Sequence, residues 1–248
     1  MALPPLLVAV IYLLYRDFDR LAHPDPPAPA VAAPAPPPPR APAPAAPAPA
    51  ASEVFGAIYQ DAAWGKNAAG EGTSGSGSLL ATTVVYRAYL QAFMKTHGIT
   101  SVVDAGCGDW EFSHALDWKG IDYKGYDVVE SVIARNKAKY SAPNIHFFVA
   151  DIVKEDLPPA DLLVSKHVLQ HLPTADVTTF LGQLEKYRHV LLTNTVWQTT
   201  MSAENADIAI GEFRPLDPTR PPFNLRGVKD LTWWDGYHMH QVVHIARK

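Results

Sequence analysis

Cysteine is almost absent from this chain, because Cys107 is the only one among 248 residues. A single thiol excludes an internal disulfide, a cysteine-rich zinc site and redox chemistry by paired thiols. An excess of positive charge is missing as well, since the formal net charge is −4. We therefore expect no nucleic-acid partner, because a nucleic acid requires a basic surface.

The chain has little that could cross a membrane. Leu3–Tyr15 is an apolar run of 13 residues, whereas a transmembrane helix needs about 20. We keep two interpretations of residues 1–23: a membrane anchor, or a tail that binds a partner. No basic region precedes the run, which disfavours a cleaved secretory signal. Arg16 and Arg20 follow it, so an anchor would leave the remaining chain in the cytoplasm.

Proline and alanine dominate the next segment, where they make up 23 of the 26 residues from Pro24 to Pro49. Such a composition cannot pack a core and favours extended polyproline II backbone. We assign residues 24–51 to a disordered linker and residues 52–248 to one folded domain.

Strand and helix signals alternate after the linker, which is typical of a parallel sheet flanked by helices. Apolar runs predict strands at 99–105, 122–129, 144–151, 161–165 and 189–195, and helices at 79–95, 109–116, 129–140 and 174–186. Thr174 is expected to cap the last of these helices. Asp235-Gly236 lies between two β-prone runs and predicts a hairpin. The pattern as a whole predicts an α/β fold with a doubly wound sheet and an antiparallel end.

A glycine-rich turn follows the first strand, in the sequence Asp104-Ala-Gly-Cys-Gly-Asp109. Gly106 and Gly108 allow the backbone to approach a ligand closely. Asp127 comes 21 residues after Gly106, at the end of the second strand, where a carboxylate can accept hydrogen bonds from a ribose diol. The alternative is a plain turn with acidic helix caps.

Two features of this turn favour S-adenosylmethionine over a dinucleotide. Glu111 stands where the third glycine of the dinucleotide fingerprint would fall. Asp109 and Glu111 also place negative charge at a predicted helix start, which opposes a pyrophosphate. A donor with a sulfonium cation and no phosphate meets no such obstacle. A NAD(P)-dependent oxidoreductase and a non-catalytic donor-binding module remain the alternatives.

Further polar side chains follow other strands. Asp151 comes after the third strand and could accept from an adenine amino group, with Val128 and Ile152 on either side of the ring. Lys166 ends the fourth strand. Carboxyl ends of parallel strands share one edge, so we expect these residues to meet at one crevice.

The stretches VVDAGCGDWEFS, DWKGIDYKGYDVV, NIHFFVADI, VSKHVLQHLP and YRHVLLTNT resemble a bacterial-type group of class I S-adenosylmethionine-dependent methyltransferases in order and spacing. The resemblance implies a Rossmann-like sheet of seven strands in the order 3-2-1-4-5-7-6, with the last strand antiparallel and helices on both faces. It implies S-adenosylmethionine as the cofactor, bound at the positions named above and at Asp104 and Cys107. It also suggests an N-terminal lid at residues 54–80, with Trp64 and Ser76 as contacts. The alternative for residues 63–78 is a flexible linker.

Methyl transfer to a hydroxyl requires a base, and two histidines follow the fourth strand. His171 is our first candidate and His167 the second, because imidazole titrates near neutral pH. The relatives commonly have an acidic residue at position 167, so the base is not assigned by the resemblance. A structural role for His171 is the alternative. We expect no metal site. The pair His167 and His171 lacks a third ligand, and His238, His240 and His244 have in common only that alternation along a strand points them to the same side.

The acceptor is predicted to be a small molecule or a glycan. Asn194 ends the fifth strand, and Arg214 and Asp217 lie in a proline-rich loop of the kind that carries substrate selectivity. The alternative is an ion pair between Arg214 and Asp217 that fixes the loop. Of Trp233 and Trp234, alternation places one in the core. The sequence sets neither the acceptor nor the oligomeric state.

Overall fold

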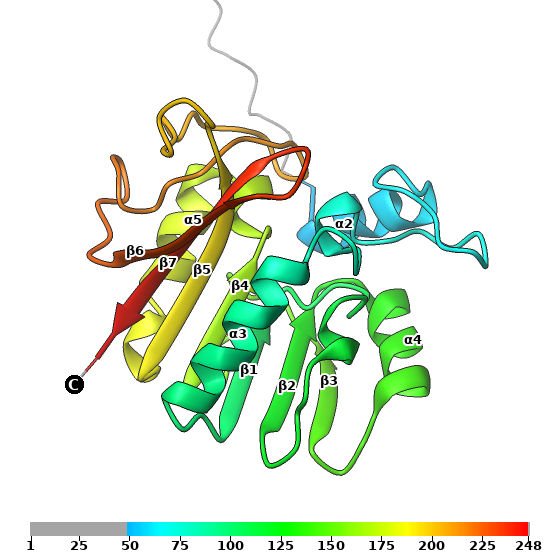
Figure 1. Ribbon diagram of the computed structural model, residues 1–248. Coiled ribbons are helices and arrows are strands. Elements are labelled where there is room, and N and C mark those ends of the chain that lie inside the picture. Colours follow the sequence, from blue (N-terminus) through cyan, green and yellow to red (C-terminus); the bar gives the residue numbers. More distant parts are fainter. Residues whose placement is uncertain (1–48, 248) are drawn as a thin grey trace, which may run out of the picture. The chain divides into compact units, whose positions relative to one another are not determined.

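The computed structural model describes residues 49–247, and this part of the chain is arranged around seven strands in the order β3-β2-β1-β4-β5-β7-β6 (Figure 1). The strands are β1 (Ser101–Ala105), β2 (Asp122–Asp127), β3 (Ile145–Val149), β4 (Leu162–Lys166), β5 (His189–Val196), β6 (Val228–Trp234) and β7 (Met239–Ala246). Strands β1 to β5 are parallel, and β7 is antiparallel to both of its neighbours. The predicted fold class and strand order are confirmed.

Helices cover both faces of this sheet, α3 in front and α5 behind in Figure 1. They are α2 (Ala51–Gln60), α3 (Val84–Thr96), α4 (Glu130–Tyr140) and α5 (Thr174–Leu181), with 3₁₀ turns at Ser76–Ser78, Ser113–Ala115, Leu169–His171 and Leu184–Lys186. Side chains alternate along each strand, so Val102 packs in the α3 core and Val103 in the α5 core. Burial on both faces explains the continuous apolar runs.

The helix predicted at 109–116 is wrong. Only a 3₁₀ turn forms there, at Ser113–Ala115. Trp110 has φ +58°, a left-handed conformation that an α-helix cannot contain. The Trp110 side chain is buried among Trp118, Tyr123, Tyr140 and Phe147. Packing of one large aromatic ring has therefore outweighed the local helix signals.

Two other helices are shorter than predicted. The predicted helix 79–95 begins only at Val84, and α5 ends at Leu181 instead of Lys186. Thr174 is not the cap that the sequence indicates, because its side chain makes no capping bond. Asp207 instead accepts from the Thr174 backbone amide at 2.8 Å, so a residue from a distant loop satisfies this helix end.

The predicted hairpin forms from β6 and β7. Its loop spans residues 235–238, where the Asp235 carboxylate accepts from the backbone amides of Tyr237 and His238. Trp233 is buried and Trp234 is half exposed, as alternation predicts.

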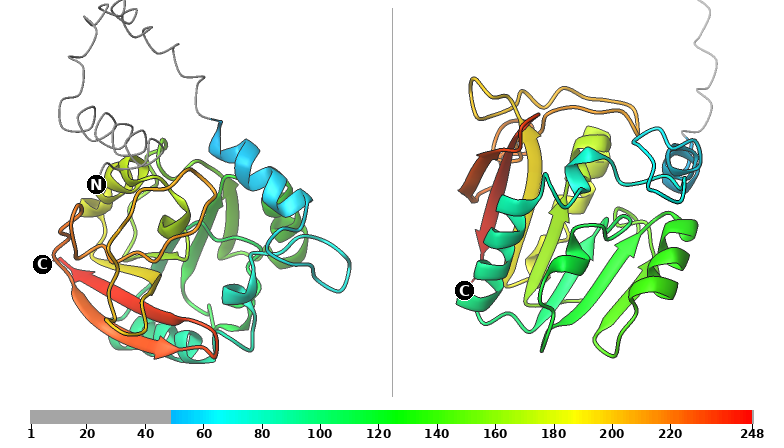
Figure 2. Two further views of the ribbon diagram at one scale, coloured as in Figure 1. Left: turned by 90° about the horizontal axis from the view of Figure 1, so that it is seen from above. Right: turned by 45° about the vertical axis from the view of Figure 1, so that its right-hand side comes forward.

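The first described helix, α2, starts at Ala51, one residue before the predicted start of the folded domain. Figure 2 shows residues 51–80, in blue and cyan, over the carboxyl edge of the sheet. In the part of the chain that the structure describes, no helix is long and apolar enough to span a membrane. The predicted anchor at 1–23 and nearly all of the predicted linker lie outside the described residues, so the anchor and its cytoplasmic orientation remain predictions.

Candidate active site

A cavity of about 710 Å³ lies at the carboxyl ends of the parallel strands, beneath residues 49–78. Thirteen of the predicted site residues line it: Trp64, Ser76, Asp104, Gly106, Cys107, Gly108, Asp127, Val128, Asp151, Ile152, Lys166, His167 and His171. Pro49, Ala50 and Ala51 line it too, although we assigned them to the linker. The topology thus brings together residues as far apart in sequence as Trp64 and His171.

The two glycines of the turn after β1 have positive φ, +86° at Gly106 and +55° at Gly108. A Cβ on Gly106 would lie 2.3 Å from Cγ2 of Val168, and one on Gly108 would lie 2.3 Å from Oγ of Ser74. Side chains of this chain itself therefore require glycine at both positions. Packing against Val168 and Ser74 thus accounts for glycine at both positions, and the close approach of a ligand to this turn remains a prediction.

Asp127 ends β2 with its carboxylate on the glycine turn. Its Oδ2 accepts from the amide of Gly108 and its Oδ1 from the amide of Val129, each at 3.0 Å. Burial raises the pKa of Asp127 above its usual value, and the two amide bonds oppose that rise. Each oxygen has a further lone pair with which to accept a hydroxyl from the cavity.

Asp151 lies just after β3, beside Ile152. Its Oδ1 accepts from the amide of Val153 at 3.1 Å, and its Oδ2 pairs with Nζ of Lys154 at 2.9 Å. These contacts fix the carboxylate at the cavity wall, where the sequence predicts a contact with adenine.

Residues 54–80, which the resemblance predicts to be a lid and which are called the lid below, are tied to the glycine turn through Asp109. Its carboxylate accepts from the amide and the hydroxyl of Ser74, and its own amide donates to Oγ of Ser74 at 2.8 Å. The sequence predicts Asp109 as a negative charge at a helix start. Because no α-helix forms there, that objection to a pyrophosphate no longer applies, and Asp109 serves to hold the lid.

Aromatic rings connect the lid with the opposite wall. The ring of Trp64 lies 4.9 Å from that of His171, which lies 5.8 Å from Phe213. Phe213 is half exposed and lines the cavity. Phe213 is not among the predicted site residues, and its only signal in the sequence is an aromatic residue at the start of the proline-rich loop.

His171 keeps one ring nitrogen free for chemistry. Its Nδ1 lies 2.9 Å from the carbonyl oxygen of Glu212, so Nδ1 carries the proton and Nε2 presents a lone pair. The contact of Nε2 with the Gln170 amide is long, at 3.5 Å. Burial lowers the pKa of His171, which keeps the ring neutral near pH 7.

Lys166 and His167 occupy the end of β4. Nζ of Lys166 donates to the carbonyl oxygen of Gly77 in the lid at 2.6 Å and lies 3.1 Å from Nδ1 of His167. Burial lowers the pKa of Lys166 to about 7 and the pKa of His167 well below its usual value.

His167 is bound on its other side as well. Its Nε2 lies 3.0 Å from Nδ1 of His240, whose Nε2 lies 2.8 Å from Oδ2 of Asp235. The sequence predicts neither contact: it indicates Asp235 only as a hairpin turn residue, and His240 only as one of three histidines on the same side of a strand. With both ring nitrogens bonded, His167 has none left for a substrate.

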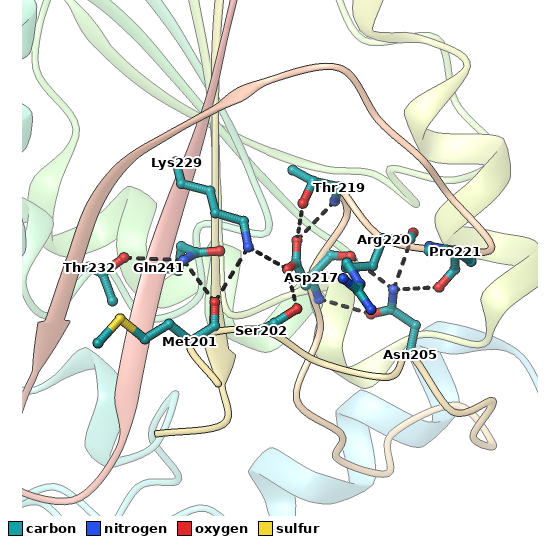
Figure 3. A network of polar contacts seen from close by, with 10 residues as sticks. All are labelled: Met201, Ser202, Asn205, Asp217, Thr219, Arg220, Pro221, Lys229, Thr232 and Gln241. Carbon is teal, nitrogen blue, oxygen red and sulfur yellow. Dashed lines mark hydrogen bonds and ion pairs between the residues drawn. The ribbon is translucent and has the colours of Figure 1, made fainter. Parts of the chain in front are cut away.

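The three residues predicted on the substrate side do not line the cavity. Asn194 and Arg214 are buried, and their side-chain nitrogen and oxygen atoms have no hydrogen-bond partner within residues 49–247. Asp217 pairs with Lys229 at 2.7 Å, not with Arg214, and also accepts from Ser202 and Thr219 (Figure 3). The loop is indeed fixed by an ion pair, but by a different one from the pair we considered.

Charge at the cavity is mainly negative. Four aspartates line it, at 104, 127, 151 and 176, against the two lysines 154 and 166. Within residues 49–247, no group of three or more His, Cys, Asp or Glu side chains could hold a metal ion. His238 and His240 face the cavity, whereas the ring of His244 packs on Phe93.

Comparison with known proteins supports the class of protein that the fold and the cavity define. Residues 102–189 match a family described as "Methyltransferase domain". The structure is similar to magnesium protoporphyrin IX methyltransferase from Synechocystis PCC 6803 with bound S-adenosylhomocysteine, with a TM-score of 0.55 at 15% identity over 79% of this chain and 98% of that chain. It is also similar to N-methyltransferase NodS from Bradyrhizobium japonicum WM9, with a TM-score of 0.51 at 14% identity over 66% of this chain and 86% of that chain. No curated protein sequence matches the chain.

These likenesses show the fold, which is the seven-stranded Rossmann-like fold of methyltransferases. The family match covers β1 to the start of β5 and so includes the glycine turn, Asp127, Lys166 and His171. The family match is limited to residues 102–189, and it is one of the observations behind the function proposed below.

Proposed function

We propose that this chain transfers a methyl group from S-adenosylmethionine to a hydroxyl group of a small molecule or glycan. The observation that carries the proposal is the carboxylate of Asp127, held by the glycine turn at the wall of the cavity. It stands where a ribose diol binds in a fold of this class. The family match supports the same donor. We also propose that the chain belongs to the bacterial-type group of class I methyltransferases that the sequence from Asp104 to Trp110 resembles.

The cavity fits this cofactor in size and charge. Ligand pockets commonly measure about 300–1,000 Å³, and this one measures about 710 Å³. S-adenosylmethionine would supply a methyl group activated by a sulfonium cation. The excess of aspartate over lysine in the lining favours a cation over a pyrophosphate, which supports the methyl donor over NAD(P).

His171 is proposed to accept the proton of the acceptor hydroxyl. Its Nε2 lone pair and its lowered pKa support this role. Phe213 and Trp64 flank its ring and would pack against the acceptor. Arg214, Asn194 and Asp217 would affect the acceptor only through the loop that they support.

Calorimetry with S-adenosylhomocysteine tests the donor. We expect the parent to bind it and Asp127→Asn to bind at least about a hundredfold more weakly, because loss of a buried charged hydrogen bond costs about 1.5–3 kcal/mol per bond. Asp122→Asn removes a carboxylate from the start of the same strand, where it faces Lys124, and should bind like the parent. A thermal shift by NAD or NADP, without one by S-adenosylhomocysteine, would favour an oxidoreductase instead.

The acceptor class is tested by incubating the parent and His171→Gln with radiolabelled donor and a native extract. Label in a base-stable ether, transferred by the parent and much more slowly by His171→Gln, is the expected result. Label in an amine product would contradict O-methylation while leaving the donor assignment in place.

A further inference from the structure

Four side chains form one hydrogen-bonded row that begins at the cavity wall. It runs from Lys166 on β4 through His167 and His240 to Asp235 in the β6–β7 turn, with contacts of 3.1, 3.0 and 2.8 Å. The side chains of His240 and Asp235 are only 3% and 4% exposed. The row therefore joins a cavity-lining amine to a carboxylate in a hairpin turn.

The direction of every hydrogen bond in this row follows from Asp235. Burial opposes its ionisation, but the amide of His238 and the ring of His240 hold the pKa of Asp235 below its usual value. An ionised carboxylate only accepts, so Nε2 of His240 carries the proton and Nδ1 must accept. Nε2 of His167 must then donate, and its Nδ1 accepts from Lys166. All donors point from the cavity toward the turn.

The amine at the cavity end has two acceptors for its hydrogens. Nζ of Lys166 donates to Gly77 and to His167, and otherwise faces the rings of Tyr86 and Phe112. A neutral amine uses its two hydrogens in these bonds and keeps a lone pair. In contrast, both ring nitrogens of His167 are hydrogen-bonded. Lys166 is therefore a better candidate than His167 for the second base.

We propose that Lys166 is a second proton acceptor of this cavity beside His171, and that His167, His240 and Asp235 relay the proton to the β6–β7 turn. The inference rests on the proposed O-methylation. It assigns His167, His240 and Asp235 as positioning residues, since none of them needs to touch the acceptor.

The relay balances in protons and electrons. The hydroxyl oxygen forms the new bond to the methyl carbon, the carbon–sulfur bond breaks with its electron pair on sulfur, and the hydroxyl proton passes to the lone pair of Lys166. Lys166 gives a proton to Nδ1 of His167, Nε2 of His167 gives one to Nδ1 of His240, and Nε2 of His240 gives one to Oδ2 of Asp235. Both rings end as the other neutral tautomer. Asp235 then releases its proton to water, and each ring gives up its Nδ1 proton and takes one on Nε2 by exchange with water before the next turnover.

The surroundings of Lys166 are consistent with this role. Burial lowers its pKa to about 7, opposed by the charges of Asp235 and Asp104. The other titratable groups near the relay are His171 and His238, which face His167. The pKa of His240 is lowered to about 4 by burial, so the relay rings stay neutral at pH 7 and can both accept and donate.

Asp235→Asn tests the direction of the relay without changing the size of the side chain. Oδ1 of residue 235 must still accept from the amides of Tyr237 and His238, so the new NH₂ group faces Nε2 of His240. That contact makes Nε2 an acceptor and moves the proton of His240 to Nδ1. His167 must then carry its proton on Nδ1, where it can no longer accept from Lys166.

The full-length protein labelled with ¹⁵N reports these tautomers directly. In long-range ¹H–¹⁵N spectra at pH 7 we expect His167 and His240 of the parent as neutral Nε2–H rings, and of Asp235→Asn as Nδ1–H rings. His167→Gln and His240→Gln assign the signals. Asp230→Asn is the matched control, because Asp230 lies in β6 but contacts Tyr89 and His244 instead. Unchanged tautomers in Asp235→Asn would overturn the relay.

The pH profile of label transfer tests the catalytic part. We expect the parent rate to rise with pH through about 7 and the Asp235→Asn rate at pH 7 to fall at least about tenfold, since proton transfer by a positioned group contributes about 10²–10⁴. Changed tautomers with a rate and profile like those of Asp230→Asn would mean that His171 alone accepts the proton, and would overturn the role of Lys166. A parent that binds no S-adenosylhomocysteine would instead refute the proposed function. The tautomer measurement does not depend on that outcome, because it reports only the hydrogen bonds of the row.

Discussion

Ser74 and Asp109 hold each other through three hydrogen bonds, although they lie 35 residues apart. The amide and hydroxyl of Ser74 donate to the Asp109 carboxylate at 3.0 and 2.8 Å, and the amide of Asp109 donates back to Oγ of Ser74 at 2.8 Å. Tyr59 from α2 adds a hydroxyl contact to Ser74 at 2.7 Å. The lid is therefore fixed to the glycine turn by one small side chain.

Ser74→Ala should loosen this attachment and weaken ligand binding. Hydrogen bonds to a charged group contribute about 1.5–3 kcal/mol, so we expect the affinity for S-adenosylhomocysteine to fall about tenfold. Calorimetry measures the change. Ser141→Ala, at an exposed position after α4, is the control. Equal affinities for both variants would show that the lid does not contribute to binding.

The affinity for S-adenosylmethionine should depend on pH more strongly than the affinity for S-adenosylhomocysteine. Burial lowers the pKa of Lys166 to about 7, so the amine is charged below that pH and neutral above it. A sulfonium in the same cavity is repelled by the charged amine. We expect the affinity for S-adenosylmethionine to rise between pH 6 and 8, and that for the uncharged thioether S-adenosylhomocysteine to change much less. In Lys166→Met the difference should become smaller but not vanish, because Asp104 also lines the cavity and its pKa is raised to about 7. Parallel curves for the parent would contradict this prediction.

Asp217→Ala should destabilise the domain. Asp217 is fully buried and accepts from Ser202, Thr219 and the partly exposed Lys229. Its removal deprives these donors of a charged acceptor, which costs about 1.5–3 kcal/mol per hydrogen bond. Urea denaturation measures the loss. Asp61→Ala, at an exposed position, is the control. Because Asp217 lies outside the cavity lining, folded Asp217→Ala should bind S-adenosylhomocysteine as the parent does. Weaker binding by the folded variant would show that Asp217 contributes to the ligand site.

Asp104 should make the stability of the domain depend on pH. Burial raises its pKa to about 7, opposed by the hydroxyl of Tyr123 at 2.6 Å. A carboxyl whose pKa is raised by folding favours the folded state at low pH, and that contribution is lost as pH rises toward 7. The unfolding free energy of Asp104→Asn relative to the parent should therefore increase between pH 4.5 and 7.5. Denaturation at both values measures it, and a constant difference would contradict the raised pKa.

Much of the sheet could be predicted from local pattern. Runs such as Val102-Val103 and Leu162–Val164 are apolar on both faces because helices cover both sides of the sheet. The strand order required the resemblance to a known family, because periodicity alone does not choose neighbours. The carboxyl-edge rule then placed Asp127, Asp151 and Lys166 at one cavity.

Side-chain partners were much less predictable. Nothing near position 110 in the sequence shows that Trp110 turns into an aromatic cluster and prevents a helix. Likewise, Arg214 and Asp217 are close in the chain and opposite in charge, yet Asp217 pairs with Lys229 from β6. Such pairings depend on how distant segments pack.

The order of polar and apolar residues along this chain determined its alternating strands and helices, and with them the edge where a ligand could bind. Only the tertiary structure decided that His171 keeps a free ring nitrogen while His167 is bonded on both sides, through His240 and Asp235 from a hairpin some 70 residues away. The physical reason is that strand periodicity is a local property, whereas a hydrogen bond requires two atoms within about 3 Å of each other.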